Sequence, residues 1–120
     1  GEWVQFAIEE IESGKLIGDI GLKPELYDYR VVEFGISIAK NYSFKGLAKD
    51  AVVGAMEFLF KEKNIHRLIG IANCENENSI NLLKRLGFRK EAHFKKSYCI
   101  NEVWTDEYLF ALLKEEWIDF

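Results

Sequence analysis

The chain has 120 residues, a formal net charge of −4, 48 % hydrophobic residues and 14 % aromatic residues. This composition is typical of a single folded domain, and the acidic balance excludes a broad basic surface for nucleic acid or anionic membranes. No apolar run approaches the roughly 18 residues that a membrane-spanning helix needs, and no basic-then-apolar leader opens the sequence. Cys74 and Cys99 form no metal-ligand pattern, so we expect reduced thiols in a cytoplasmic protein without a metal.

The first part of the chain shows the period of β-strands. Residues 4–8 alternate between large apolar and smaller or polar side chains, and residues 16–22 return as a second strand after a turn at 12–15. We expect residues 23–30, which hold the one proline, to form a loop. Residues 31–39 are rich in β-branched and aromatic side chains and predict a third strand.

Helical spacing of apolar residues begins next. Residues 48–60 predict an amphipathic helix that ends near Asn64. A short buried strand at 68–72 precedes a second helix at 79–86, which Gly87 terminates because glycine accepts the left-handed conformation after a helix.

The last part of the chain returns to strand patterns. We expect strands at 88–98 and 103–113, a connecting turn at 100–102, and a final helical turn that contains Trp117. The whole order predicts an α+β fold with a mixed, mostly antiparallel sheet and helices on both faces.

The loop at 41–48 joins the third predicted strand to the first predicted helix. Gly46 and Ala48 leave room for backbone N–H groups to point outward at the positive end of the helix dipole, where they form a cradle for an anion. Lys45 adds local positive charge. An ordinary strand-to-helix connection is the alternative, because the loop has neither the ending of a P-loop nor the three glycines of a dinucleotide fingerprint.

A second strand-to-helix corner, at 73–79, is crowded with amides. Asn76 or Asn78 is suited to cap the following helix, because an asparagine oxygen accepts hydrogen bonds from N–H groups of the first turn. More neutral donors gather there than one cap requires. This surplus suits a ligand that itself carries amides, such as a pantetheine arm.

The two corners resemble the cofactor motifs of the GNAT acetyltransferase superfamily. The pattern Asn76-x-x-Ser79-x-x-Leu82-Leu83-x-x-Leu86-Gly87-Phe88 is similar to its second cofactor motif, and Ser43-x-x-Gly46-x-Ala48 resembles its pyrophosphate loop. Residues 106–117 and 65–67 are similar to the RimJ/RimL subgroup of ribosomal-protein N-acetyltransferases. The resemblance extends from about residue 6 to residue 117 and rests on the order and spacing of these pieces.

The chain departs from the family pattern at three positions and in length. Ser43 stands where glutamine or arginine is usual, Phe44 replaces a customary glycine, and Leu83 occupies the place of a tyrosine acid found in many members. The sequence begins at what resembles the second strand of the family. We therefore expect one acetyltransferase-like domain, residues 1–120, that lacks the first strand and the first two helices of the family.

The resemblance implies direct transfer of an acetyl group from acetyl-CoA to a primary amine, with a protein N-terminal α-amine as the expected acceptor. An α-amine with a pKa near 8 is about a tenth neutral at pH 7, whereas fewer than about one lysine in a thousand is neutral. Glu33, which faces opposite to Val32 and Phe34 on the third strand, is the expected base, acting through water, and a carboxylate at the rim or edge of the sheet is the alternative. Ser79 is the expected acid for the leaving thiolate or a cofactor ligand, and Tyr98 is a second candidate for the acid.

The resemblance also implies where the cofactor binds. Backbone N–H groups of the third strand would hold the thioester carbonyl, and the two corners would hold pyrophosphate and pantetheine. The expected cofactor-binding residues are Gly35, Ile36, Ser37, Ile38, Ser43, Phe44, Lys45, Gly46, Leu47, Ala48, Asn76 and Ser79. Two alternatives stay open: a small-molecule acceptor (a polyamine, an amino acid or an aminoglycoside) and a catalytically silent CoA-binding module. We expect a monomer or homodimer without nucleic-acid or membrane partners.

Overall fold

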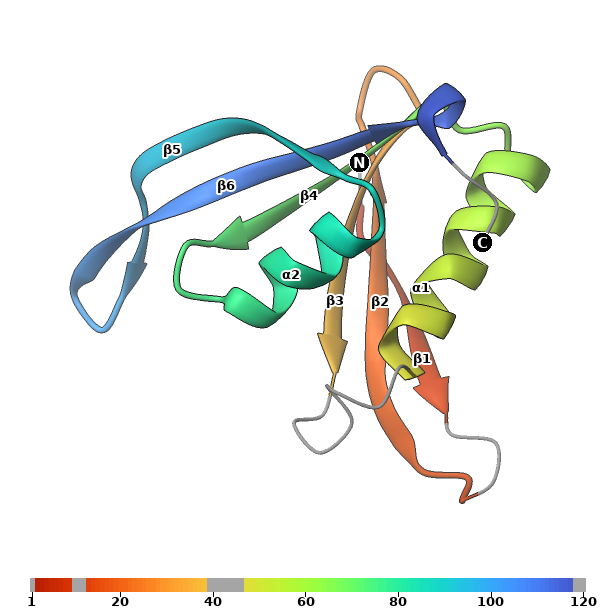
Figure 1. The fold of residues 1–120 in the computed structure, drawn as a ribbon, viewed down its shortest axis with the longest axis horizontal. Helices are drawn as coiled ribbons and strands as arrows, with labels where there is room; N and C mark the ends of the chain where they lie inside the picture. The colour runs from red at the N-terminus through yellow and green to blue at the C-terminus, as the bar shows by residue number, and fades with distance from the viewer. Residues whose placement is uncertain (1, 10–12, 39–46, 118–120) are drawn as a thin grey trace.

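The computed structural model describes residues 2–9, 13–38 and 47–117, and Figure 1 shows how their elements are arranged. The strands and helices are β1 (Val4–Glu9), β2 (Leu16–Pro24), β3 (Val31–Ile38), α1 (Leu47–Glu57) with a π-helical continuation (Phe58–Glu62), β4 (Arg67–Asn73), α2 (Glu77–Arg85), β5 (Arg89–Ile100), β6 (Val103–Leu113) and a 3-10 turn (Lys114–Glu116). No helix in these ranges is long and apolar enough to span a membrane.

The strands form one six-stranded sheet in the order β1-β2-β3-β4-β6-β5. Four of its five contacts are antiparallel, and only β3 and β4 run parallel. The predicted mixed, mostly antiparallel sheet is therefore confirmed. β3 and β4 pair only from Val31 and Arg67 to Glu33 and Ile69, after which the two strands diverge (Figure 1).

One hydrophobic core lies on one face of this sheet. Its sheet members include Val32 and Phe34 of β3 and Leu68 of β4, which are all buried. The α1 residues Val52 and Met56 and the α2 residue Leu83 belong to the same core, so both helices lie on this face (Figure 1). Helices on both faces, as expected from the sequence, are not seen in the described part of the chain, because both apolar helix stripes are buried against the same alternating set of strand residues.

The second helix begins and ends where its sequence provides caps. The Asn76 side chain accepts a hydrogen bond from the Ser79 N–H at 3.1 Å, so α2 starts at Glu77, two residues before the predicted start. At the other end, the Gly87 N–H donates to the Lys84 carbonyl and the Phe88 N–H donates to the Leu83 carbonyl. With Gly87 at φ +92°, these bonds form a Schellman motif, which confirms the predicted stop.

Two elements differ from the prediction for identifiable reasons. β2 continues through Pro24, which pairs with Val32 as the last residue of the strand, a place where a missing N–H and an extended φ are tolerated. Trp117 follows the 3-10 turn instead of lying inside it, and its ring packs 5.6 Å from the ring of Phe60. The predicted turn between the last two strands narrows to Asn101 and Glu102, which both have positive φ.

Candidate active site

The divergence of β3 from β4 leaves backbone groups of β3 without a partner on one side. β3 stays paired with β2 as far as Ile38, through antiparallel contacts such as Gly21 with Gly35 and Ile20 with Ile36. In an antiparallel ladder, alternate residues bond to the neighbour and the others point their N–H and C=O groups away from it. Beyond Glu33, the described residues show no pairing of β3 with β4, so those outward groups point toward the space between the two diverging strands.

The expected cofactor residues on β3 line this gap from different sides. Gly35 is exposed on the helix-free face, and Ile36 is half-buried on the core face. Ser37 and Ile38 form the end of the strand. Gly35 has no side chain beyond hydrogen, so only its backbone groups can hydrogen-bond to a ligand.

The expected pyrophosphate loop falls largely outside the described residues. Ser43, Phe44, Lys45 and Gly46 lie outside them, whereas Leu47 and Ala48 belong to the first turn of α1. Figure 1 shows the end of β3 and the beginning of α1 at the same end of the molecule. The positive end of the α1 dipole therefore lies near the end of the gap.

The amide-rich corner before α2 is held by its own hydrogen bonds. The Asn76 oxygen caps the helix, which is the ordinary structural role weighed from the sequence, and its NH2 group is left to other partners. Ser79 is half-buried, and within residues 47–117 its hydroxyl has no hydrogen-bond partner. Gly70 of β4 allows Leu83 of α2 to approach closely, since a Cβ at Gly70 would lie 3.3 Å from Leu83 Cδ2.

Glu33 lies at the last paired position of β3, on the face that carries no helix. Partial burial raises the pKa of its carboxyl, the nearby Glu25 and Glu107 carboxylates raise it further, and Lys23 lowers it. A carboxylate with a raised pKa is a stronger base than an exposed one. Glu33 and the helix α2, which carries Ser79, thus lie on opposite faces of the sheet.

The structure also shows where the two histidines and the second candidate acid, Tyr98, lie. The backbone N–H of His66 donates to the Arg30 carbonyl at 2.8 Å. His93 is exposed, and its Nε2 lies 2.7 Å from a carboxylate oxygen of Asp106. Tyr98 is 52 % exposed on β5, where its pairing with Thr105 puts it on the same helix-free face as Glu33.

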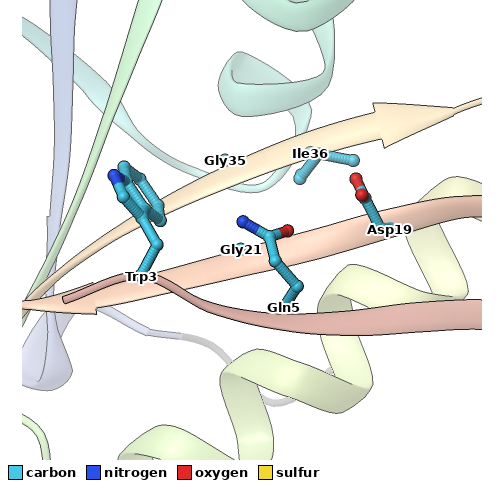
Figure 2. Close-up of a pocket in the computed structure, with 6 residues that line it drawn as sticks. All are labelled: Trp3, Gln5, Asp19, Gly21, Gly35 and Ile36. Carbon is cyan, nitrogen blue, oxygen red and sulfur yellow. The ribbon is translucent and has the colours of Figure 1, made fainter.

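The sequence analysis missed a hollow on the helix-free face of β1, β2 and β3. It has a volume of about 450 Å³ and is lined by Trp3, Gln5, Asp19, Gly21, Gly35 and Ile36 (Figure 2). The hollow exists because Gly21 and Gly35 face each other across β2 and β3. A Cβ at Gly21 would lie 2.9 Å from the Gln5 amide nitrogen and 3.1 Å from the Trp3 ring. The only sequence signal was two glycines within strands, and their register was needed to pair them.

Comparison with known proteins identifies the family. Residues 1–89 match the acetyltransferase (GNAT) domain family, so the chain belongs to the GNAT acetyltransferases. It is 31 % identical to the crystal structure of a GNAT-family acetyltransferase from Bacillus anthracis, with a TM-score of 0.85 over 93 % of this chain and 67 % of that chain.

Three curated relatives show the range within the family. The chain is 41 % identical to the uncharacterized N-acetyltransferase YnaD of Bacillus subtilis over 71 % of this chain and 50 % of the relative. It is 35 % identical to the ribosomal protein uS5-alanine N-acetyltransferase of Escherichia coli over 69 % of this chain and 43 % of the relative. It is 27 % identical to the spermidine N(1)-acetyltransferase of Vibrio cholerae over 96 % of this chain and 66 % of the relative. The chain spans about half the length of the first two relatives.

Proposed function

We propose that this chain is a single acetyltransferase-like domain that binds acetyl-CoA and transfers its acetyl group directly to a primary amine. The observation that supports this most strongly is the early end of pairing between β3 and β4, beyond which β4 leads into the amide-rich corner before α2. A gap lined by backbone N–H groups suits the amides of a pantetheine arm and the carbonyl of a thioester. Membership of the GNAT family points to the same cosubstrate.

In the proposed reaction the amine nitrogen attacks the thioester carbonyl, and the carbon–sulfur bond breaks. Outward N–H groups of β3 beyond Glu33 stabilise the negative charge that develops on the oxygen. Glu33 receives the amine proton through water, which its raised pKa favours. Ser79, whose hydroxyl has no partner within residues 47–117, bonds the cofactor or passes a proton to the departing thiolate.

For the acceptor we propose a protein N-terminal α-amine. The relative that acts on an alanine of ribosomal protein uS5 supports this class, as does a carboxylate, Glu33, as the candidate base. An α-amine needs less help with deprotonation than a lysine does.

A polyamine is the second candidate acceptor. The spermidine relative matches 96 % of this chain, and the carboxylates of Glu25 and Glu107 add negative charge around Glu33. A flexible dication or trication would be drawn to such a field. A silent CoA-binding module is the third possibility, motivated by Ser43 and Leu83 at positions where the family pattern has other residues.

Calorimetry with CoA and acetyl-CoA, followed by a thiol-release assay, tests these proposals. We expect binding of both cosubstrates and turnover with a peptide that begins with alanine. Turnover with spermidine alone would favour the polyamine acceptor, and binding without turnover on any amine would favour the silent module. A chain that binds neither CoA nor acetyl-CoA would contradict the proposed function.

A further inference from the structure

A line of neutral hydrogen bonds joins the β5–β6 hairpin to the corner that precedes α2. The Asn73 Nδ2 at the end of β4 donates to the Thr105 Oγ1 of β6 at 2.7 Å. The Thr105 hydroxyl in turn donates to the Tyr98 carbonyl of β5 at 3.0 Å. Asn73 and Thr105 are 32 residues apart in sequence and both are half-buried.

Asn73 also organises the corner from its other side. Its Oδ1 accepts a hydrogen bond from the Glu75 N–H at 3.0 Å, and its backbone carbonyl accepts one from the Asn76 N–H at 2.9 Å. Asn76 then caps α2 through the Ser79 N–H. The positions of Asn76 and Ser79, the two expected cofactor residues of this corner, therefore depend on Asn73.

The hydroxyl of Thr105 fixes which group is the donor and which is the acceptor in each of these hydrogen bonds. A threonine hydroxyl has one hydrogen, and here it is donated to the Tyr98 carbonyl, so Thr105 can only accept from Asn73. Asn73 must then present its NH2 group to Thr105 and its oxygen to Glu75. The reverse orientation of the amide would place two acceptors against each other at Thr105 and two donors against each other at Glu75.

This arrangement exceeds what a turn requires. An asparagine that stabilises a turn after a strand uses its side-chain oxygen alone. Here the second end of the same amide reaches across to the hairpin, where regular pairing is interrupted between Phe94 and Tyr98 and Lys96 has a φ of +49°. The Thr105 hydrogen bond to Tyr98 therefore helps to set the position of a segment that the ladder does not hold continuously.

We infer that Asn73 and Thr105 are positioning residues, which hold the cofactor-side corner of Asn76 and Ser79 in register with the hairpin segment of Tyr98. This inference rests on the proposed acetyl transfer, in which the corner contacts the cosubstrate and Tyr98 lies on the same face of the sheet as the proposed base Glu33. A reaction between two bound groups is sensitive to their relative placement, so a pair that links the two sides affects both.

The variant Asn73→Asp separates this role from that of a turn. Aspartate keeps the oxygen that accepts from Glu75 but has no NH2 group for Thr105. We expect N73D, which loses the hydrogen bond to Thr105, to raise the CoA dissociation constant about fivefold, and T105V, which also loses the bond to the Tyr98 carbonyl, to raise it at least as much. T105S keeps the hydroxyl and should bind like the wild type, as should N81A, which removes an exposed amide from α2.

Amide hydrogen exchange of the unliganded protein supplies a readout that needs no activity. We expect N73D and T105V to speed exchange at the Glu75 and Ser79 N–H groups about fivefold, while T105S and N81A leave both at wild-type rates. The N73D/T105V double variant should show no more than the larger single effect, because both changes break one interaction.

Wild-type exchange rates and CoA affinity in N73D and T105V would overturn the inference, and so would additive effects in the double variant. If the wild-type chain binds no CoA, the proposed function is contradicted, and so is the role of Asn73 and Thr105 in acetyl transfer. The exchange rates would still show whether Thr105 holds the corner, so the two failures are distinguishable.

Discussion

The two halves of the sheet are held together in different ways. In the half formed by β4, β6 and β5, side chains bond across strands: Arg67 to Glu91, His93 to Asp106, Ser97 to Glu107 and Asn73 to Thr105. In the described residues of the β1–β3 half, the side-chain hydrogen bonds are local, from Lys15 to Ser13 and from Arg30 to Asp28. The second half of the sheet, β4–β6–β5, is therefore fixed by polar bonds between strands, whereas the first half, β1–β3, relies on its backbone ladder and on the core.

The two halves meet in only three residue pairs, Val31–Glu33 with Arg67–Ile69. The candidate site begins where this seam ends. The gap is therefore produced by the short length of this seam, which the packing beneath it must maintain, and not by any single side chain in the gap. The following substitutions test the seam and the two halves in turn.

Leu68→Ala should have the largest effect. Leu68 pairs with Val32 at the centre of the seam and its side chain is 0 % exposed. Its truncation leaves a cavity under both halves and should lower the free energy of unfolding by about 2–5 kcal/mol, measured by urea denaturation. Ile71→Ala on the same strand is the matched control, because Ile71 is 41 % exposed and should cost less than about 1 kcal/mol. Equal losses in the two variants would contradict the role of the seam.

Glu33→Gln tests the first half at the end of the seam. Removal of the proposed base should lower kcat about tenfold to hundredfold with the peptide acceptor. Because burial raises the pKa of Glu33 above its unfolded value, the charged carboxylate destabilises the fold above the folded pKa. E33Q should therefore have a larger free energy of unfolding than the wild type at pH 7. This difference should vanish as the pH falls through the pKa of Glu33 in the folded state and then below its pKa in the unfolded state. Unchanged kcat would remove Glu33 from the mechanism.

Asn76 tests the corner on the other half. Asn76→Ala loses the helix cap and should destabilise the protein by about 1 kcal/mol in thermal unfolding, whereas Asn76→Asp keeps a capping oxygen and should not. Both variants lose the NH2 group, so both should weaken CoA binding several-fold if that group contacts the cosubstrate. Normal CoA affinity in N76D would restrict Asn76 to its capping role.

Glu91→Gln should have the smallest effect and tests the ionic bonds of the second half. Hydrogen bonds from Arg67, followed by those from Arg89, hold the pKa of Glu91 below its usual value. A lowered carboxyl pKa gives stability that is present above the unfolded pKa and is lost as the pH falls through the folded one. The unfolding temperature should therefore fall slightly less in E91Q than in the wild type between pH 7 and pH 3. The difference is small because the ion pair is near the surface. Glu57→Gln, which removes an exposed ion pair on α1, is the matched charge control.

Local chemistry made much of this fold predictable from the sequence. The alternation of apolar and polar residues identified the strands. Asn76 and Gly87 marked the two ends of α2, because helix caps act within one turn. The length of β2 was underestimated at Pro24, since only the register shows that this proline lies at a strand end. The family was recognised from spaced motifs and is confirmed by the domain match.

The site was less predictable, because it depends on faces and on contacts that are distant in sequence. The sequence predicted that Glu33 faces opposite to Phe34. It did not predict that both helices lie on the face of Phe34 and leave the face of Glu33 open. The facing pair Gly21 and Gly35 and the bond between Asn73 and Thr105 required the register of the strands. The roles of Glu33, Ser79 and the other expected site residues remain predictions for the experiments above.

The two outer strands of the described sheet, β5 and β1, differ in how readily they would pair with a strand of another molecule. β5 has a break in its regular pairing and carries Lys95 and Lys96 there, features that hinder the addition of a foreign strand. β1, at the opposite rim, exposes Val4 and Phe6 and carries no lysine. Within the described residues, pairing with a strand of another molecule is therefore favoured at β1 over β5, and a lysine introduced on β1 should hinder it.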